Sequence, residues 1–275
     1  MNARILIIFI TLILIVSSCT KMKVQGQEDV DGNTYERVDV YSDIKPKEGV
    51  RPLAMGFEAN DCEFDMVYVS GGYLHPKDED QREEYINHFY IGKTEVTQKL
   101  WTAVMGYNHS FFVDEENPVE TITYAEAVEF THRISSIIGR NFRLPTEMEW
   151  RFAAYGGNAS RRTTYSGSEK FWEVAWLFEN SGDHTHHVGT KLPNELGIYD
   201  MTGNVSEWCS DLYYGNSGDS SNNGYSYFHI HRGATWSSIA ADATIMSVSR
   251  KYLYTSNSQV GFAWLWIAIN TLKII

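Results

Sequence analysis

The sequence predicts an α+β domain with long loops and little regular structure. Two amphipathic helices in the first half of the domain each begin with a capping box, in which a threonine and the glutamate three residues later bond reciprocally to the helix start. Runs rich in β-branched and aromatic residues, typical of strands, lie before and after these helices. Between residues 157 and 227, Gly, Asn, Ser and Asp interrupt every regular pattern. Loops this long within a compact domain are usually functional, or braced by a metal.

The chain opens with an export signal. Arg4 gives a positive start, and residues 5–16 form an apolar run broken only by Thr11. This run is too short for an easy membrane span, which needs about 20 residues, but it suits the apolar region of a signal peptide. The VSSC segment at residues 16–19 resembles the bacterial lipobox. We therefore expect residues 1–18 to be a lipoprotein signal peptide, with an uncleaved N-terminal anchor as the alternative.

Cys19 is the predicted lipidation site, and acyl chains on it would hold the mature protein stably at a membrane. Thr20 follows it, where an aspartate is often linked to retention at the inner membrane, so we expect the outer membrane. Residues 19–60 are polar, acidic and poor in apolar periodicity, which predicts a flexible tether. The folded domain is then expected over residues 61–270.

Composition narrows the class of partner. The 275 residues carry 43% hydrophobic side chains and a net charge of −12. The apolar content is that of a globular protein, and an acidic surface repels phosphate backbones, so no nucleic-acid partner is expected. Besides Cys19, the chain has Cys62 and Cys209. They could pair in an oxidising compartment or remain free thiols, and the sequence leaves both possibilities open.

Helices are expected at three places, each announced by a threonine that can cap the first turn. Their starts and ends are, in order, a start near Thr97; a capping box of Thr123 and Glu126 with an end at Gly139; and a capping box of Thr146 and Glu149 with an end at residues 156–157.

Strands are expected on both sides of the helices. Residues 66–69 and 88–96 form the early pair, and residues 228–236, 244–252 and 260–269 form the late group. Apolar side chains occupy both faces of the last segment. A strand that is apolar on both faces is expected at the centre of a sheet, where both faces are buried.

Several segments, taken together and in order, resemble the formylglycine-generating enzyme (sulfatase-modifying factor) family. The resemblance covers about residues 64–269 and implies a mixed α+β domain related to C-type lectins. The segments are FYIGKTEVT at 89–97, NPVE at 117–120, FRLPTEMEW at 142–150, GG at 156–157, GIYDMTGNVSEW at 197–208, RGATW at 232–236 and GF at 261–262.

The resemblance also implies a structural calcium site. In the family, an acidic or amide side chain, two main-chain carbonyls and a glutamate form an oxygen cage, and these map onto Asp200, Gly203, Val205 and Glu207. Hard oxygen ligands suit Ca²⁺, and the alternative is a capped turn without metal. Asn180 matches the start of a second calcium loop in the family, although the segment that follows it looks shortened.

The resemblance argues against the family's own chemistry. Its enzymes oxidise a sulfatase cysteine to formylglycine with copper and oxygen, and two cysteines hold Cu(I). Alignment on Arg250 places those positions at Asp242 and Ser247. Because Cu(I) prefers soft thiolates, we expect no copper and no catalytic residues, and we interpret the domain as a pseudoenzyme.

Histidines offer a different route to an enzyme. His184, His186 and His187 cluster in one loop, and His229 and His231 have strand spacing on one face. Imidazoles bind zinc or iron, so a metal-dependent oxidase is an alternative function. The plainer interpretation is a polar loop and a half-exposed strand.

The function favoured by these features is an exported lipoprotein whose domain binds a surface ligand or an envelope protein. Lectin-like folds carry variable loops on a fixed scaffold, which suits recognition. Trp236, Tyr252 and Tyr254 are candidate ligand anchors, unless they belong to the core. A structural subunit of an envelope gliding or secretion machine is the further alternative.

Overall fold

The computed structural model describes residues 24–28, 34–39, 54–74, 83–216, 225–251, 256–262 and 264–266. Residues 1–18, Cys19, Tyr252 and Tyr254 lie outside these ranges, so the signal peptide, the lipidation site and two of the predicted ligand anchors remain predictions. Across the ranges described, no helix is both long and apolar enough to cross a membrane.

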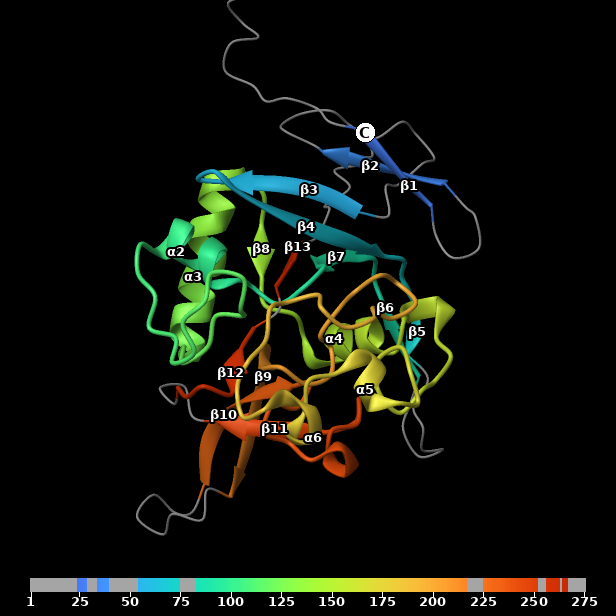
Figure 1. Ribbon diagram of the computed structural model, residues 1–275, viewed down its shortest axis with the longest axis vertical. Coiled ribbons are helices and arrows are strands. Elements are labelled where there is room, and N and C mark those ends of the chain that lie inside the picture. Colours follow the sequence, from blue (N-terminus) through green and yellow to red (C-terminus); the bar gives the residue numbers. More distant parts are fainter. Residues whose placement is uncertain are drawn as a thin grey trace, which may run out of the picture.

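A seven-stranded sheet forms one end of the domain (Figure 1). Its strands are antiparallel except for one parallel pair, β2 with β3. In spatial order they are β1 (Val24–Glu28), β2 (Thr34–Asp39), β3 (Ala54–Ala59), β4 (Cys62–Val69), β7 (Phe89–Gly92), β13 (Leu265–Trp266) and β8 (Phe142–Arg143).

The sheet extends into residues 19–60, the stretch predicted to be a flexible tether. β3 pairs along its whole length with β4, and the ring of Phe57 stacks on that of Phe64 at 5.4 Å. Met55, Phe57 and Ala59 alternate with other positions and are buried at 4% exposure or less, the period of two that a strand requires. The folded part therefore begins at Ala54 or earlier, and the expected boundary at residue 61 is too late.

A four-stranded sheet forms the opposite end. Its order is β11 (Val248–Lys251), β10 (Tyr225–Arg232), β9 (Ser206–Asn216) and β12 (Val260–Gly261), with β12 parallel to β9. The predicted strand at 260–269 divides into β12 here and β13 in the larger sheet. β13 lies between β7 and β8, as expected for a central strand. A separate hairpin pairs β5 (Gly72–Leu74) with β6 (Glu84–Ile86).

The three predicted helices are confirmed. They are α2 (Gln98–Met105), α3 (Tyr124–Ile138) and α4 (Glu147–Ala154), capped by Thr97, Thr123 and Thr146, and both predicted capping boxes are formed. α2 and α3 pack together beside the larger sheet, and α4 lies between the two sheets (Figure 1). The ring of Trp101 on α2 stacks on that of Phe130 on α3 at 5.5 Å, which ties the helix pair into the core.

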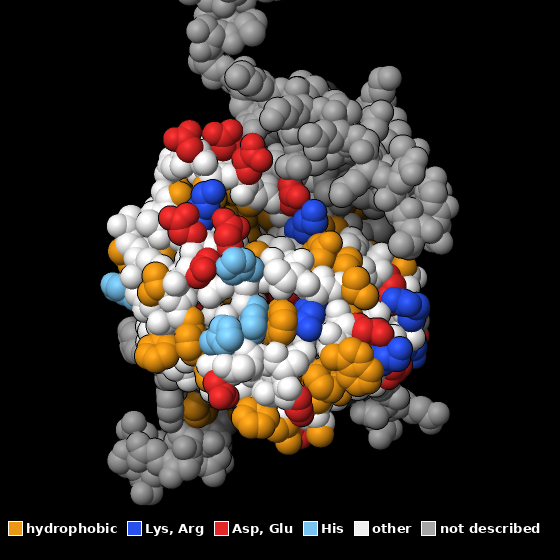
Figure 2. Space-filling model, viewed as in Figure 1, with side chains coloured by type: hydrophobic (Ala, Val, Ile, Leu, Met, Phe, Trp, Pro, Cys, Tyr) orange, Lys and Arg blue, Asp and Glu red, His pale blue; other side chains and the backbone are white. Residues whose placement is uncertain are grey.

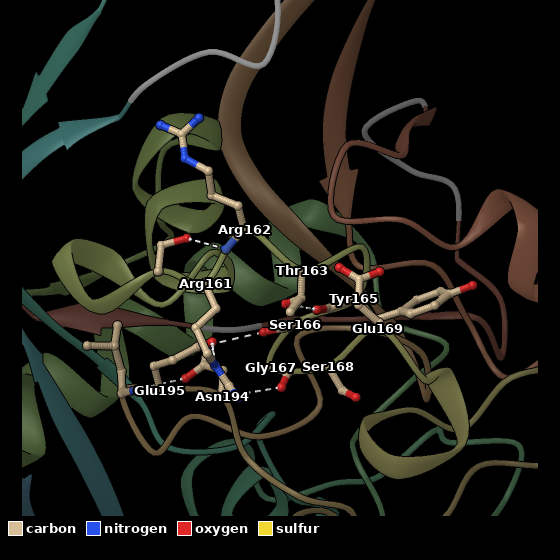
Figure 3. A network of polar contacts seen from close by, with 12 residues as sticks. Arg161, Arg162, Thr163, Tyr165, Ser166, Gly167, Ser168, Glu169, Asn194 and Glu195 are labelled. Atoms are coloured by element: carbon tan, nitrogen blue, oxygen red, sulfur yellow. Dashed lines mark hydrogen bonds and ion pairs between the residues drawn. The ribbon is translucent and has the colours of Figure 1, made fainter.

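The loop-rich middle is held by polar side chains rather than by regular structure (Figure 3). The amide of Asn194 donates to Ala153 O at 2.9 Å and to Ser166 Oγ at 3.1 Å, and Ser166 Oγ donates to Ala154 O at 2.7 Å. These bonds are buried and fasten the loop to the end of α4. The short helices in this part of the chain are η2 (Gly157–Ala159), α5 (Phe171–Val174), α6 (Phe178–Ser181) and, later, η4 (Ala240–Asp242).

Candidate functional site

Three carboxylates are buried between the two sheets. Glu95 follows β7, Asp200 lies in the loop before β9, and Glu207 lies within β9, and each is 3% exposed or less. No ion pair within the described part of the chain involves any of them. Buried carboxylates without a cationic partner are costly unless protonated or bound to a metal ion.

Hydrogen bonds satisfy these carboxylates only in part. Asp200 Oδ2 accepts from Gly189 N at 2.6 Å, whereas Asp200 Oδ1 is buried and has no partner in the structure as described. Glu207 Oε2 accepts from Trp150 Nε1 at 2.5 Å. The orphaned oxygen of Asp200 is the feature that a bound cation would explain, because a buried acceptor is rarely left without a partner.

Burial raises the pKa values of all three carboxyl side chains. Burial raises the pKa of Asp200 to about 6 and that of Glu207 to about 8. For Glu95, burial and then the charges of Asp200 and Glu207 raise the pKa well above its usual range. The charged forms are disfavoured because the interior cannot solvate them, so a bound cation would favour ionisation of Glu207 at neutral pH and stabilise the charge of Asp200.

The turn that carries the predicted calcium ligands is tightly fixed. Gly203 has φ of 83°, and a Cβ built on it would lie 2.3 Å from Trp176 O. Asn204 next to it donates from Nδ2 to Glu95 Oε2 at 2.8 Å, and Val205 N donates to Glu95 Oε1 at 3.0 Å. Glu95 therefore fixes the segment at Asn204 and Val205. The two carbonyls of the proposed cage, Gly203 O and Val205 O, lie at either end of this segment.

The oxygen atoms of the Asp200–Glu207 turn fit calcium, but two of the proposed ligands are main-chain carbonyls rather than side chains. Within the residues described, no group of three or more His, Cys, Asp or Glu side chains is placed to hold one metal ion. A cation at this turn would therefore depend on Asp200, Glu207 and the carbonyls of Gly203 and Val205, and such a mixed oxygen set is typical of Ca²⁺. Calcium here remains a prediction.

Asn180, the residue proposed for a second calcium loop, has a structural role. Its Oδ1 accepts from Leu177 N at 2.8 Å and its Nδ2 donates to Ala175 O at 3.0 Å. These bonds close the start of α6 and use both ends of the amide. A cation at Asn180 also remains a prediction.

Sequence reasoning missed Glu95 and Trp150 as parts of this site. Glu95 lies in the polar stretch KTEVT that follows β7, next to another charged residue, Lys93, and no local signal indicates that its side chain is buried. Trp150 looked like an ordinary core residue of a capped helix, and nothing in the sequence indicates that its Nε1 would reach Glu207.

The two positions that align with the family's thiol pair are close together in space. Asp242 ends η4 and Ser247 lies in the turn before β11, where Ser247 Oγ donates to Asp242 O. Neither side chain is a sulfur donor. The thiols that the described chain does carry, at Cys62 and Cys209, are buried elsewhere and free, and burial raises the pKa of both thiols.

The loop histidines bond to the protein rather than converging on a metal. His184 Nδ1 contacts Gly182 O at 2.9 Å and His186 Nε2 contacts Ser181 O at 2.7 Å. His187 Nε2 lies 3.2 Å from Asp114 Oδ2. With these ring nitrogens engaged, the loop does not present three imidazoles to one ion.

The strand histidines differ from their prediction. His229 and His231 are 8% and 4% exposed, not half-exposed. The ring of His229 stacks on Tyr124 at 3.4 Å, and His231 Nδ1 contacts Ser206 Oγ at 2.8 Å. Side chains of other elements cover both rings: Tyr124 at the start of α3 covers His229, and Trp208 of β9 packs edge-on against His231 at 5.6 Å.

A row of contacting rings crosses one face of the domain. Trp236 packs edge-on against Phe112 at 5.5 Å, Phe112 contacts His184 at 6.4 Å, His184 contacts His186 at 4.3 Å, and His186 stacks on Trp176 at 3.7 Å. We call these five residues the aromatic row. Figure 2 shows histidine side chains grouped on the visible face, with hydrophobic side chains beside them.

Exposed apolar side chains border the aromatic row. Phe111 adjoins Phe112 and is 71% exposed, and Trp172 and Phe178 are each 56% exposed. Ile239, beside Asp242 on η4, is 48% exposed. Large apolar residues that gather on one exposed face are typical of a binding surface. Trp236, the described member of the predicted ligand anchors, is half-buried within this surface and donates from Nε1 to Ser258 O at 2.9 Å.

Comparisons with known proteins agree with this architecture. Residues 51–266 match the family described as "Sulfatase-modifying factor enzyme 1-like domain". The chain is 36% identical over 197 residues to "Chaperone protein LppX" of Paenibacillus barcinonensis, covering 53% of this chain and 70% of that protein. It is 31% identical over 126 residues to the formylglycine-generating enzyme of Thermomonospora curvata, covering 41% of this chain and 39% of the enzyme.

One solved structure has a similar fold. "Treponema denticola variable protein 1" superposes with a TM-score of 0.68 at 25% identity, covering 78% of this chain and 99% of that one. The coverage of the curated relatives is uneven. The chain spans more than two thirds of the Paenibacillus protein but well under half of the Thermomonospora enzyme.

Proposed function

This chain belongs to the sulfatase-modifying factor family, and we propose that it is a lipid-anchored envelope protein that binds a ligand or another envelope protein instead of oxidising a sulfatase. One observation carries this proposal. The turn that aligns with the family's thiol pair holds Asp242 and Ser247 at those positions, joined by a hydrogen bond from Ser247 Oγ to Asp242 O, and carries no thiol. A carboxylate and a hydroxyl are hard donors and do not replace thiolates for Cu(I).

The aromatic row supports a binding role for the face of the domain on which it lies. Phe178 N donates to Ser238 O and Ser181 Oγ donates to Trp236 O, so α6 and the loop after β10 form one continuous surface. Indole and phenyl side chains at such a surface supply most of the energy of many protein interfaces. Hydrogen bonds fix this surface in advance, which lowers the entropy cost of binding.

Anchoring through Cys19 would place this surface at the outer membrane. The support is the sequence itself, in which an apolar run of signal-peptide length leads directly into the VSSC segment. Labelling with a radioactive or clickable fatty acid tests the proposal. Label should appear on the wild-type protein and be absent from Cys19→Ala, and label that persists on Cys19→Ala would refute it.

A bound calcium ion is proposed as a structural element beneath the binding face. The orphaned Asp200 Oδ1 and the raised pKa of Glu207 support it. A cation there would brace the turn that also fixes the main chain of His186, because His186 N donates to Asn204 Oδ1 at 2.9 Å. Calcium and ligand binding would then be coupled through the aromatic row.

A site-specific crosslinking experiment tests the binding role. A photoreactive residue placed at Phe111, which is 71% exposed, should crosslink in intact cells to a defined envelope component. Trp236→Ala should abolish that product. A photoreactive residue at Ile137, 43% exposed on α3, is the matched control and should not give it.

Two outcomes would overturn the proposal. The first is a crosslink that forms equally from both positions, because it would show contact without recognition. The second is conversion of a cysteine-bearing sulfatase peptide to the aldehyde by the purified protein with copper and oxygen. Metal analysis of the same preparation should find calcium and no stoichiometric copper, iron or zinc.

A second candidate function is assistance to another exported protein. The relative from Paenibacillus barcinonensis is named a chaperone protein, and the match spans enough of it to make a shared role reasonable. Exposed apolar side chains around the aromatic row suit a client with apolar segments. Under this proposal, deletion of the chain should lower the amount or activity of one envelope protein that Phe111 crosslinks, and unchanged amount and activity of that protein would argue against it.

A further inference from the structure

A cavity of about 410 Å³ lies between the larger sheet and α2, apart from the aromatic row. Its walls come from β4, from the chain that leaves β7, from the start of α2 and from the loops at Gly189 and Tyr199. Small-molecule sites in proteins typically have volumes of roughly 300–1,000 Å³. The cavity is therefore large enough for a small ligand, and neither the metal turn nor the binding face requires it.

Carboxylates outnumber cations in the lining of this cavity. Glu63 and Asp65 line it together with one lysine, Lys93, and the buried Glu95, whose raised pKa disfavours its charged form, borders it as well. Lys93 Nζ pairs with Asp65 Oδ2 at 3.3 Å, which leaves the exposed Glu63 without a cation in the lining. The whole chain carries a net charge of −12. A negative cavity on a negative protein attracts cations and repels anions.

Aromatic rings form the remaining walls. Phe64 and Trp264 lie with their ring centroids 4.6 Å apart, and Tyr199 lines the cavity as well. The faces of such rings attract an ammonium group and also pack against alkyl chains. Thr94 adds a hydroxyl, but it is already bonded to Glu95 O at 3.0 Å. The combination favours an organic cation over a bare metal ion, which would gain nothing from the rings.

We propose that this cavity binds a small organic cation, a primary amine on a short alkyl chain, with the ammonium group held by Glu63 and Asp65 and the chain against Phe64 and Trp264. The proposal goes beyond recognition of an envelope partner and does not depend on it. Binding here would add a small-molecule input to a protein that also meets a macromolecule.

Isothermal titration of the full mature chain in detergent tests the proposal with three probes of equal length. 1,5-Diaminopentane should bind saturably and 1-aminopentane should bind more weakly, while pentanoate should not bind. The three have alkyl chains of similar length, so the contrast between either amine and pentanoate reports mainly the sign of the charge. Saturable binding of pentanoate, or no binding of either amine, would overturn the proposal.

Two variants locate the site through effects of opposite sign. Glu63→Gln should weaken diamine binding by about two- to fivefold, the range typical of one exposed charge pair. Lys93→Gln should strengthen it by a similar factor, because it removes the competing ammonium from Asp65. Glu84→Gln is the matched control, an exposed carboxylate on β6 outside the cavity lining, and should leave binding unchanged.

The variants also separate folding from binding. Glu63 is exposed, so Glu63→Gln should keep the melting temperature of the wild type. Equal affinity for the diamine in all three variants would place the amine elsewhere and refute the site. A reversal of both signs would show that the cavity prefers anions and would refute the class of ligand.

Discussion

Two turns align with the metal sites that the family resemblance predicts, and they differ in burial. The Asp200–Glu207 turn is buried and carries two carboxyl side chains, one oxygen of which lacks a partner in the described structure. The Asp242–Ser247 turn is near the surface, and the Ser247 hydroxyl bonds to Asp242 O and contacts Thr244 Oγ1. Donors at an exposed turn can be exchanged with little effect on the core, whereas a buried carboxylate cluster is part of the core. Calcium at the buried turn and no copper at the exposed turn are therefore the predictions that this difference supports.

The largest effect should come from restoring sulfur to the exposed turn. The double variant Asp242→Cys, Ser247→Cys brings two thiols to positions in one turn, where Ser247 Oγ already bonds to the main-chain O of Asp242, and Cu(I) prefers such soft ligands. We expect stoichiometric Cu(I) binding by the double variant and none by the wild type, measured by competition with a chromogenic Cu(I) chelator.

The single variant Ser247→Cys is the control for this gain, since one thiolate should not compete with the chelator. Stoichiometric Cu(I) on the wild-type protein would contradict the contrast between the two turns. It would also reopen copper oxidation as a function of this chain.

The next effect concerns the backbone of the buried turn. Gly203→Ala places a Cβ 2.3 Å from Trp176 O at φ of 83°, whereas Gly106→Ala meets nothing within 4 Å at nearly the same φ, 84°. Both variants bear the left-handed strain of about 1 kcal/mol. Only Gly203→Ala adds a clash, so we expect it to cost roughly 2–3 kcal/mol more in the free energy of unfolding. Urea denaturation of the matched pair measures the difference, and equal losses would show that the turn is not tightly packed.

The third effect is the pH dependence of stability in chelator. The ordinary pKa values are 3.8 for Asp200 and 4.5 for Glu207, and the folded values are about 6 and about 8. The folded state thus holds protons that the unfolded state has released, and stability falls as pH rises through this window. Between pH 6 and 8 the loss should be on the order of 3 kcal/mol.

Calcium should cancel most of that loss, because binding to the folded state alone stabilises it. Glu207→Gln imitates the protonated side chain, so in chelator it should flatten the fall above about pH 6 and leave the part due to Asp200. Thermal melts across pH, with and without millimolar calcium, measure both effects. If the melting temperature at pH 8 is the same with and without calcium, the carboxyl groups of the turn bind protons and no metal ion.

Helix starts were predictable from the sequence because their signals are local. A threonine and a glutamate three residues later bond within one helical turn, so the capping boxes at Thr123 and Thr146 need no knowledge of the rest of the fold. The ligands of the buried turn came from resemblance rather than from local signals. The missed contacts, Glu95 with Asn204 and Trp150 with Glu207, join residues more than fifty positions apart.

The start of the larger sheet and the burial of β10 were likewise not predictable from local sequence. β3 was assigned to a tether because residues 19–60 are polar as a whole, and the short alternation of Met55, Phe57 and Ala59 was lost in that average. His229 and His231 were expected to be half-exposed because strand spacing alone does not reveal that a helix covers one face. Burial of a strand face is decided by elements distant in sequence, which periodicity cannot report.

The smallest effect should come from reductant, and it bears on the same contrast because thiols are what the exposed turn lacks. Cys62 lies in the cluster of buried residues around α2 and α3, whereas Cys209 lies in the cluster around α4. Both are free thiols, so the pairing that the sequence left open is not formed. A disulfide typically contributes roughly 2–5 kcal/mol, and its reduction would lower the melting temperature by several degrees. We expect no measurable shift with reductant and two reactive thiols after denaturation of the Cys19→Ala chain, since a bond between these cysteines would require the two cores to come apart.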